Sequence, residues 1–279
     1  MRGGTRRLVT AAVTGEPAGA SPVPRPDAAY WQFYERVAAA QVAAWLPDEP
    51  TRVLDLSGGD DRFADQLHMA GHTVVHVVGP DGRPARPWPP DADLPGADGA
   101  GVDLAPRGAA LPVVADPRRL SWLRDASVDA VLAESRVLSM CLAAEVTVLD
   151  LARVLRPGGR LLLVVESLST GLARLADQGR WAELADVPSA DVVLVPAEDG
   201  SITRCFWSEE LAGLLADAGL DVEWVRPRSV LSPAVVERAI AEGGEEALRL
   251  LVRTECALAV EREGESTGLH LLASARRPS

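Results

Sequence analysis

The sequence is poor in cationic and aromatic side chains. Its 279 residues include no lysine, so arginine supplies every strongly basic group, and the net charge is −12. Proteins that bind free nucleic acid rely on clustered cations to neutralise phosphates, so this balance argues against a nucleic-acid partner. Aromatic residues make up only 4% of the chain, which predicts a core built mostly from Val, Leu and Ala.

Two local arginine pairs stand out against the acidic background. They are Arg118 with Arg119, and Arg226 with Arg228. Because charged side chains are usually exposed, we expect both pairs to lie on the solvated surface.

Cysteine is also scarce. The three cysteines lie far apart in the chain, without the spacing of a disulfide framework or a metal site. This pattern favours a reducing compartment and buried thiols that act as small apolar side chains. Three of the four histidines are spaced by four residues, but Gly71 separates an expected helix from an expected strand between them, so no metal site is predicted.

The sequence has no apolar run close to the length of a membrane-spanning helix. Paired Arg6 and Arg7, with an Ala18-x-Ala20 ending, are similar to a twin-arginine export signal, but the apolar run at residues 8–13 is too short for one. We therefore expect a cytoplasmic protein without a membrane partner, in which residues 1–27 form a disordered tail.

The rest of the chain alternates short apolar runs with amphipathic helical segments, which is typical of βαβ units and a parallel sheet. Residues 79–110 are dense in Pro, Gly and Asp and predict a long loop. Residues 168–207 add helix and a hairpin around Asp199-Gly200. Strands are expected at residues 51–56, 73–78, 111–116, 128–133, 160–167, 221–227 and 268–277, and the main helices at 28–46, 61–70, 142–155, 208–218 and 232–260, the last bent at Gly243-Gly244.

The most informative stretch is VLDLSGGDDRFADQL, residues 53–67. It reads as a buried strand, a tight turn with two glycines and two aspartates, and the start of a helix. Turns that hold a phosphate usually avoid carboxylates, and the G-x-G-x-x-G pattern is absent, so a nicotinamide-dependent oxidoreductase is disfavoured. Two later segments belong with it: VVADPRRLSWLRDASVDAVLAES at residues 113–135 and DLARVLRPGGRLLLVVES at residues 150–167.

In this order and spacing, the three segments resemble the class I S-adenosylmethionine-dependent methyltransferases. The first stands in place of the family's V-L-D-L-G-x-G-x-G, and the third is close to its L-x-R-V-L-x-P-G-G-x-L helix, turn and strand. The resemblance implies an α/β, Rossmann-like fold over residues 28–279, with a central, mostly parallel seven-stranded sheet and helices on both faces. It also implies S-adenosyl-L-methionine as the cofactor, bound across the carboxyl ends of the strands.

The same resemblance assigns candidate cofactor-binding residues. Asp55 matches the position at the cofactor's amino-acid end, and the turn at Ser57, Gly58, Gly59 and Asp60 follows it. Asp116 matches the position whose side chain meets the adenine amino group. Each carboxylate also has a structural interpretation: Asp55 could accept backbone N–H groups of the turn, and the other two could cap the segments that follow them.

Candidate acceptor-side residues follow from the resemblance as well. Glu134 comes after the fourth strand, where the family's acceptor meets the methyl group, and is a candidate general base. Tyr30 and Tyr34 lie on the first expected helix, and Trp181 lies in the segment 168–207, where small-molecule members carry a lid. No N/D-P-P-Y motif is present, which disfavours adenine or glutamine N-methylation. We expect a small-molecule acceptor as the partner, and a homodimer is compatible with the sequence.

Three positions depart from the family pattern. Ser57 and Asp61 replace the first and third glycines, and Val78 stands where the family carries the acidic residue that binds the ribose. Asp81, three residues further on, is a candidate substitute. Losing the ribose contact would weaken binding about a hundredfold, since a hydrogen bond to a charged group contributes about 1.5–3 kcal/mol. A second interpretation therefore stays open: a methyltransferase-like protein with weakened or lost cofactor binding, which serves as a non-catalytic binding or regulatory protein.

Overall fold

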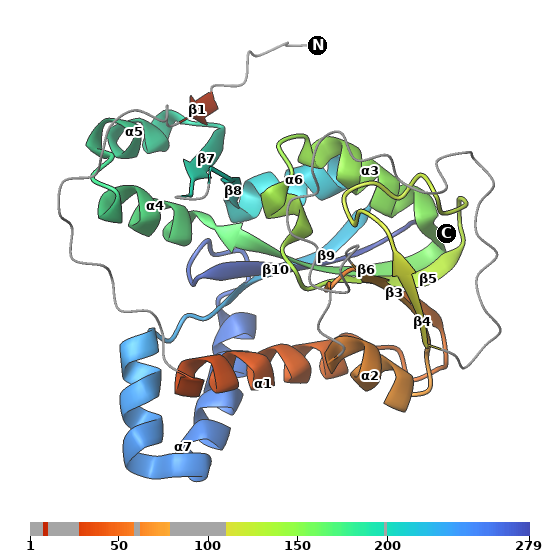
Figure 1. Cartoon of the computed structure of the whole chain (residues 1–279), viewed down its shortest axis with the longest axis horizontal. Helices are drawn as coiled ribbons and strands as arrows, with labels where there is room; N and C mark the ends of the chain where they lie inside the picture. The colour runs from red at the N-terminus through yellow and green to blue at the C-terminus, as the bar shows by residue number, and fades with distance from the viewer. Residues whose placement is uncertain (1–7, 11–27, 59–61, 79–109, 198–199) are drawn as a thin grey trace. The chain divides into compact units, whose positions relative to one another are not determined.

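The computed structural model describes residues 8–10, 28–58, 62–78, 110–197 and 200–279 (Figure 1). It comprises two compact units. Unit 1 contains Met1–Ala44, Glu166–Glu210 and Arg226–Leu271, and unit 2 contains Trp45–Val165, Leu211–Val225 and Leu272–Ser279. Most of the predicted tail and nearly all of the predicted loop at 79–110 lie outside the described residues.

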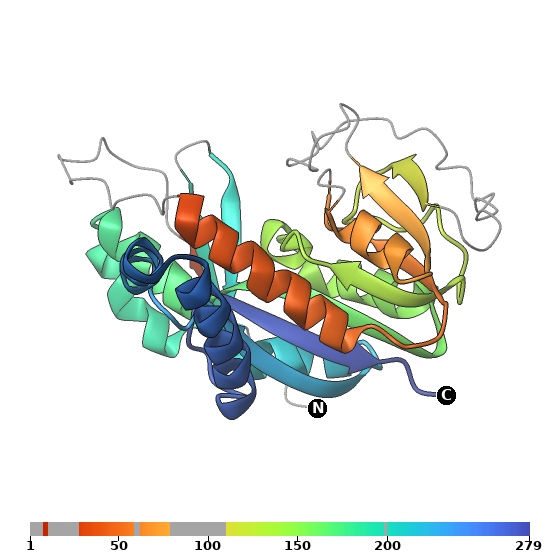
Figure 2. The same cartoon turned by 90° about the horizontal axis from the view of Figure 1, so that it is seen from below.

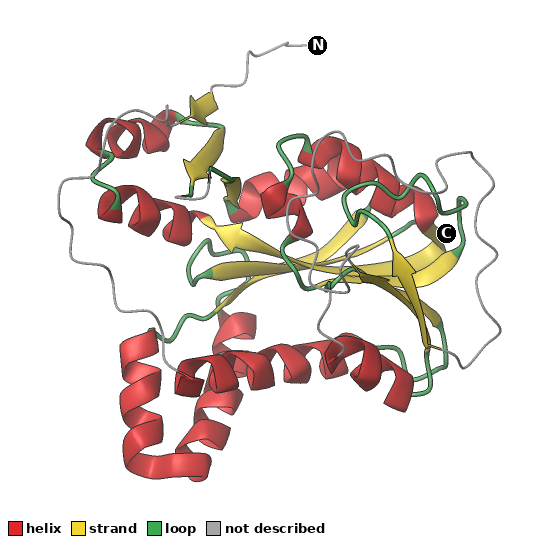
Figure 3. Ribbon diagram, viewed as in Figure 1, coloured by secondary structure: helices red, strands yellow, loops and turns green. Residues whose placement is uncertain are grey.

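Unit 2 carries a parallel sheet in the order β6, β5, β2, β3, β4, and every neighbouring pair in this run is parallel (Figure 3). Strands β9 and β10 pair with each other, and β10 also pairs with β6. The central strands are buried over most of their length, as expected for a parallel sheet covered on both faces. The bounds are β2 Arg52–Asp55, β3 Thr73–Val78, β4 Ala110–Val114, β5 Val128–Ala133, β6 Leu155–Ser167, β9 Asp221–Arg228 and β10 His270–Arg276.

Helices cover both faces of this sheet. In Figure 1, α3 (Ala144–Val154) and α6 (Ser208–Asp217) lie above the strands and α2 (Arg62–Met69) lies below them. A 3-10 helix, η1 (Val137–Met140), follows β5. These seven strands and their helices confirm the predicted α/β class with a mostly parallel sheet, and the described residues add β1, β7 and β8 for ten strands in all.

The inward face of α3 is not the one that the sequence suggests. The sequence spacing places Leu142, Val146, Leu149 and Val154 on or near one face; Val154 is buried, but the other three are exposed by 63%, 61% and 55%. The buried stripe is instead shifted around the helix, and it also has helical spacing: Ala144, Thr147, Val148, Leu151 and Ala152. Both stripes are apolar enough to pack, so the periodicity alone could not choose between them.

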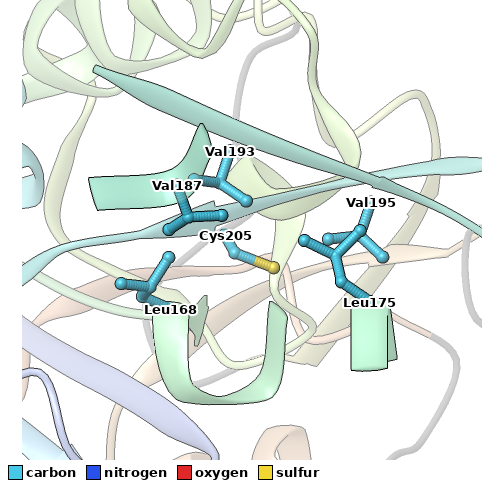
Figure 4. Close-up of a cluster of buried hydrophobic side chains, with 6 residues drawn as sticks. All are labelled: Leu168, Leu175, Val187, Val193, Val195 and Cys205. Carbon is cyan, nitrogen blue, oxygen red and sulfur yellow. The ribbon is translucent and has the colours of Figure 1, made fainter. Parts of the chain in front are cut away.

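Unit 1 contains the predicted hairpin. Strands β7 (Val192–Pro196) and β8 (Ile202–Phe206) pair in antiparallel fashion, and β1 (Leu8–Thr10) adds to β7 in parallel. Helices α4 (Leu168–Asp177) and α5 (Trp181–Asp186) and the 3-10 helix η2 (Val187–Ser189) precede the hairpin. The segment has its own apolar core, in which the Cys205 sulfur lies among aliphatic side chains (Figure 4). These are Leu168, Leu175, Val187, Val193 and Val195.

A second core in unit 1 joins α1 (Ala28–Trp45) to α7 (Pro233–Glu261), and Figure 2 shows the two helices side by side. Helix α7 bends at Gly244, where φ is 56° and ψ is −140°, as the glycine pair predicts. Tyr30, Phe33 and Val37 of α1 are buried against Val236 and other apolar side chains of α7.

Burial of Arg228 corrects the expectation of a solvated arginine pair. Its side chain is fully buried in unit 1, its Nε donates to Gln41 Oε1 at 2.6 Å, and its guanidinium lies 5.6 Å from the centre of the Tyr34 ring. A planar, weakly hydrated guanidinium tolerates burial when it gains such contacts. Arg226 is partly buried and donates to Glu263.

Within the described residues, no helix is both long and apolar enough to cross a membrane.

Candidate cofactor site

The turn after β2 is braced by a buried carboxylate. Asp55 ends β2 and is the register partner of His76 on β3, so the two side chains point to the same face of the sheet. Asp55 Oδ2 lies 2.8 Å from His76 Nδ1, and Asp55 Oδ1 accepts the backbone N–H of Ser57 at 2.9 Å. Both side chains are buried, with exposures of 0% and 3%. The structural interpretation of Asp55 is therefore confirmed, while a direct cofactor contact stays a prediction.

The same turn is held from β5. Leu56 N–H donates to Leu132 O at 2.7 Å, and the Ser135 hydroxyl donates back to Leu56 O at 2.7 Å. Gly58 follows with φ of +67°, in the left-handed region that favours glycine. The backbone of residues 55–58 is thus fixed by contacts with two neighbouring strands.

Ser57 brings a buried hydroxyl to this turn. The residue is 8% exposed, and its Oγ makes no hydrogen bond within the part of the chain that the structure describes. A buried hydroxyl without a partner is costly, by about 1–3 kcal/mol. A polar ligand atom at the turn would relieve that cost, so the donor set here fits the polar amino-acid end of the implied cofactor.

Asp116, two residues after β4, is held by Arg118. Its Oδ1 accepts the Arg118 backbone N–H at 2.9 Å, and the guanidinium donates to both oxygens from Nε and Nη2. This hydrogen bonding raises the pKa of Arg118. The capping interpretation of Asp116 is confirmed, and a carboxylate with about four lone-pair positions retains capacity for about one further donor.

Glu134 follows β5 directly and is half-buried. Because β2, β4 and β5 are parallel members of one sheet, their carboxyl ends share one edge. The sheet therefore brings Asp55, Asp116 and Glu134 of unit 2 to the same edge. Three other candidates, Gly59, Asp60 and Asp81, lie outside the described residues, as does Asp61, which replaces the family's third glycine.

The three aromatic candidates lie in unit 1. Tyr30 is fully buried and packs against Phe33, and this burial raises its pKa to about 12. The Tyr34 ring lies 5.4 Å from the His270 ring, edge to face. Trp181, on α5, is 66% exposed. Tyr30 is thus a core residue of its unit, and an acceptor contact by any of the three stays a prediction.

His76 and Ser135 are contributors to the turn that the residue pattern alone did not single out. The one available signal is a histidine inside the otherwise apolar strand TVVHVV. The described residues contain no group of three or more His, Cys, Asp or Glu placed to hold a metal ion.

Comparison with known proteins bears directly on this site. Residues 54–163, which contain the turn, Asp116 and Glu134, match the sequence model of a methyltransferase domain. A search of curated proteins finds no match.

Solved structures with the same fold are distant in sequence. A methyltransferase of Methanosarcina mazei is 16% identical, with a TM-score of 0.50 over 85% of this chain and 97% of that one. A methyltransferase of Mesorhizobium loti is 17% identical, with a TM-score of 0.50 over 86% of this chain and 98% of that one. A protein of Pyrococcus horikoshii is 17% identical, with a TM-score of 0.50 over 90% of this chain and 91% of that one. At this identity the likeness shows the fold alone.

The family match and the fold agree with each other and with the glycine turn. Residues 54–163 therefore match the methyltransferase domain family, and the fold is one that S-adenosylmethionine-dependent methyltransferases share.

Proposed function

We propose that this protein transfers the methyl group of S-adenosylmethionine to a nucleophilic atom of a small molecule. The observation that carries the proposal is the turn at residues 55–58. It is braced from two strands, enters the left-handed region at Gly58 and buries a Ser57 hydroxyl that has no hydrogen-bond partner among the described residues. It stands inside the segment that matches a methyltransferase domain.

Residues of unit 2 would hold the cofactor along the edge of the sheet. We propose that Ser57 and Gly58, with Asp55 behind them, receive its amino-acid end, and that Asp116 receives its adenine. Gly59, Asp60 and Asp81 are proposed to complete the site. When bound, S-adenosylmethionine supplies a sulfonium methyl group that is open to displacement. The negative carboxylates suit this positive ligand, since opposite charges attract.

The chain's own contribution to catalysis is alignment. Fixed groups on both sides of a reacting pair remove much of the entropic barrier of a bimolecular displacement. Glu134 is proposed to orient the acceptor and to take its proton at a carboxylate oxygen. Its position after β5 is fixed by Ser135, whose hydroxyl is bonded to the cofactor turn.

Two features support a small acceptor. The net charge of −12 is unsuited to a polyanionic substrate such as nucleic acid. The inserted segment 168–207 has its own apolar core and presents an exposed Trp181, which is proposed as an acceptor contact. Tyr30 and Tyr34 remain proposed contacts from α1.

A cytoplasmic setting belongs to the same proposal. The three cysteines are free thiols, and two of them are buried. Thiols in this state fit a reducing compartment.

One observation favours a second function, that of a methyltransferase-like protein that binds or regulates a partner without turnover. Both described carboxylates that the family uses for the cofactor are already engaged within the chain, Asp55 by His76 and Asp116 by Arg118. The contacts of Asp116 leave little capacity for a ligand. This arrangement is what a domain would keep if the turn were retained for stability alone.

Binding and turnover separate the two functions. Purified protein should be titrated with S-adenosylmethionine in a calorimeter, then incubated with it and panels of phenols, amines and carbon nucleophiles while S-adenosylhomocysteine release is measured. Binding with acceptor-dependent release supports the enzyme. Binding without release for every acceptor class favours the second function, and no binding up to millimolar ligand rejects the proposed enzyme.

A further inference from the structure

We infer that His76 is a positioning residue for the cofactor turn: by holding Asp55, it sets the orientation in which Ser57 and Gly58 meet the ligand. The inference rests on the proposed function, since it concerns the same turn. It assigns a role to a side chain that the sequence comparison with the family does not use.

The pairing begins with strand register. Strands β2 and β3 are parallel, and Asp55 and His76 are Cα partners, so their side chains project from the same face. The resulting Oδ2 to Nδ1 distance is 2.8 Å. With the Asp55 carboxylate as the acceptor in this bond, Nδ1 is the nitrogen that carries the hydrogen.

This contact fixes the plane of the Asp55 carboxylate. One oxygen is held by His76 and the other accepts the Ser57 N–H, so the group cannot rotate without losing one of two bonds. Asp55 has no solvent exposure, and bulk water therefore cannot replace a lost partner. The position of the Ser57 backbone, and with it the direction of the buried Oγ, depends on His76 through Asp55.

His72 provides a matched control. It is also buried in unit 2 and also bonded through Nδ1, but to the backbone N–H and the hydroxyl of Thr51. Those contacts lie just before β2 and β3, at the amino ends of the strands and thus at the opposite edge from the cofactor turn. Changes at His72 test the general cost of losing a buried histidine.

Asn and Gln make a discriminating pair of substitutions at His76. The amide nitrogen of Asn is attached at the same carbon position as Nδ1, so His76→Asn can still donate to Asp55. The amide of Gln lies one bond further out and corresponds to Nε2, so His76→Gln keeps a polar side chain but loses this donor. The variants should be titrated with S-adenosylhomocysteine by calorimetry and melted without ligand, beside wild type and His72→Gln.

We expect His76→Gln to raise the Kd at least tenfold, which is about 1.4 kcal/mol. The Kd of His76→Asn should stay within about threefold of wild type and that of His72→Gln within about twofold. We expect this even if the melting temperatures of these two variants fall as far as that of His76→Gln. If His76→Gln does not fold, His76→Leu removes the same donor with an apolar side chain that suits its buried strand, and it takes the place of His76→Gln.

Three results would overturn the inference: wild-type affinity in His76→Gln, equal weakening by both His76 substitutions, or equal weakening by His72→Gln. A wild-type protein that binds no S-adenosylhomocysteine would instead reject the proposed function, and the inference would fail with it.

Discussion

Replacement of Asp116 by alanine separates a structural carboxylate from a ligand contact. In the folded protein this buried side chain accepts the backbone N–H of Arg118 and both donating groups of its guanidinium. Asp116→Ala removes the carboxylate, whereas Arg118→Ala removes only the guanidinium and leaves the carboxylate with its backbone donor. Both variants lose the ion pair, but only the first loses the group proposed to meet the adenine.

The expected magnitudes follow from these contacts. A hydrogen bond to a charged group contributes about 1.5–3 kcal/mol, and the quarter-exposed Arg118 side chain reduces the net value of the ion pair. Each variant should therefore lose about 1–3 kcal/mol of unfolding free energy, or about 2–12 °C in melting temperature at about 2–4 °C per kcal/mol. One lost adenine contact of about 1.5–3 kcal/mol would raise the Kd of S-adenosylhomocysteine about 10- to 150-fold in Asp116→Ala.

Thermal melts and calorimetric titrations of the two variants give both quantities. The account predicts similar losses of stability, with weakened binding in Asp116→Ala and less than a threefold change in Arg118→Ala. Equal weakening of binding in both variants would refute the reasoning, because it would mean that Asp116 acts only by shaping its own turn.

Three further predictions concern Glu134, Gly171 and Tyr30. Glu134→Gln should lower kcat about 10²- to 10⁴-fold with little change in the Kd of S-adenosylhomocysteine, and a matching loss of binding would contradict a role on the acceptor side. Gly171→Ala should destabilise the protein by about 1 kcal/mol in denaturant unfolding, since its Cβ would lie 2.9 Å from Cys205 Sγ and overpacking outweighs the gain in helix propensity. Adding Cys205→Ala should recover part of that loss, and a Gly171→Ala variant as stable as wild type would count against the packing described. Because burial raises the pKa of Tyr30 from 10.0 to about 12, the phenol ionises first in the unfolded chain, and its contribution to stability is intact below pH 10 and lost between pH 10 and 12. Stability of Tyr30→Phe should fall less steeply over that window, by up to about 1.4 kcal/mol per pH unit, and parallel curves would contradict this assignment.

Local pattern was sufficient for most of the fold. Apolar runs bounded by glycine and proline located the parallel strands, and the Gly243-Gly244 pair located the bend of α7, because these features depend on neighbours in the chain. The predicted inner face of α3 was largely wrong, because two apolar stripes on this helix could each pack against the sheet. The prediction that Arg228 is solvated was wrong, because its burial depends on Gln41 and Tyr34, which lie far away in the sequence.

The candidate site shows the same difference between features that depend on neighbours in the chain and features that depend on distant residues. Asp55, Ser57 and Asp116 could be named as candidates because the family motif fixes their positions along the chain. Their partners could not, because the pairing of Asp55 with His76 depends on the register between two strands. Resemblance to a family likewise gives no account of a bond such as that from the Ser135 hydroxyl to Leu56 O, because this bond depends on how two loops meet at the edge of the sheet.

The central claim is that the altered turn still binds the methyltransferase cofactor. Calorimetric titration of the wild-type protein with S-adenosylhomocysteine tests it most directly. The account predicts saturable binding with one ligand per chain and a matching rise in melting temperature. No heat and no thermal shift up to millimolar ligand would contradict it.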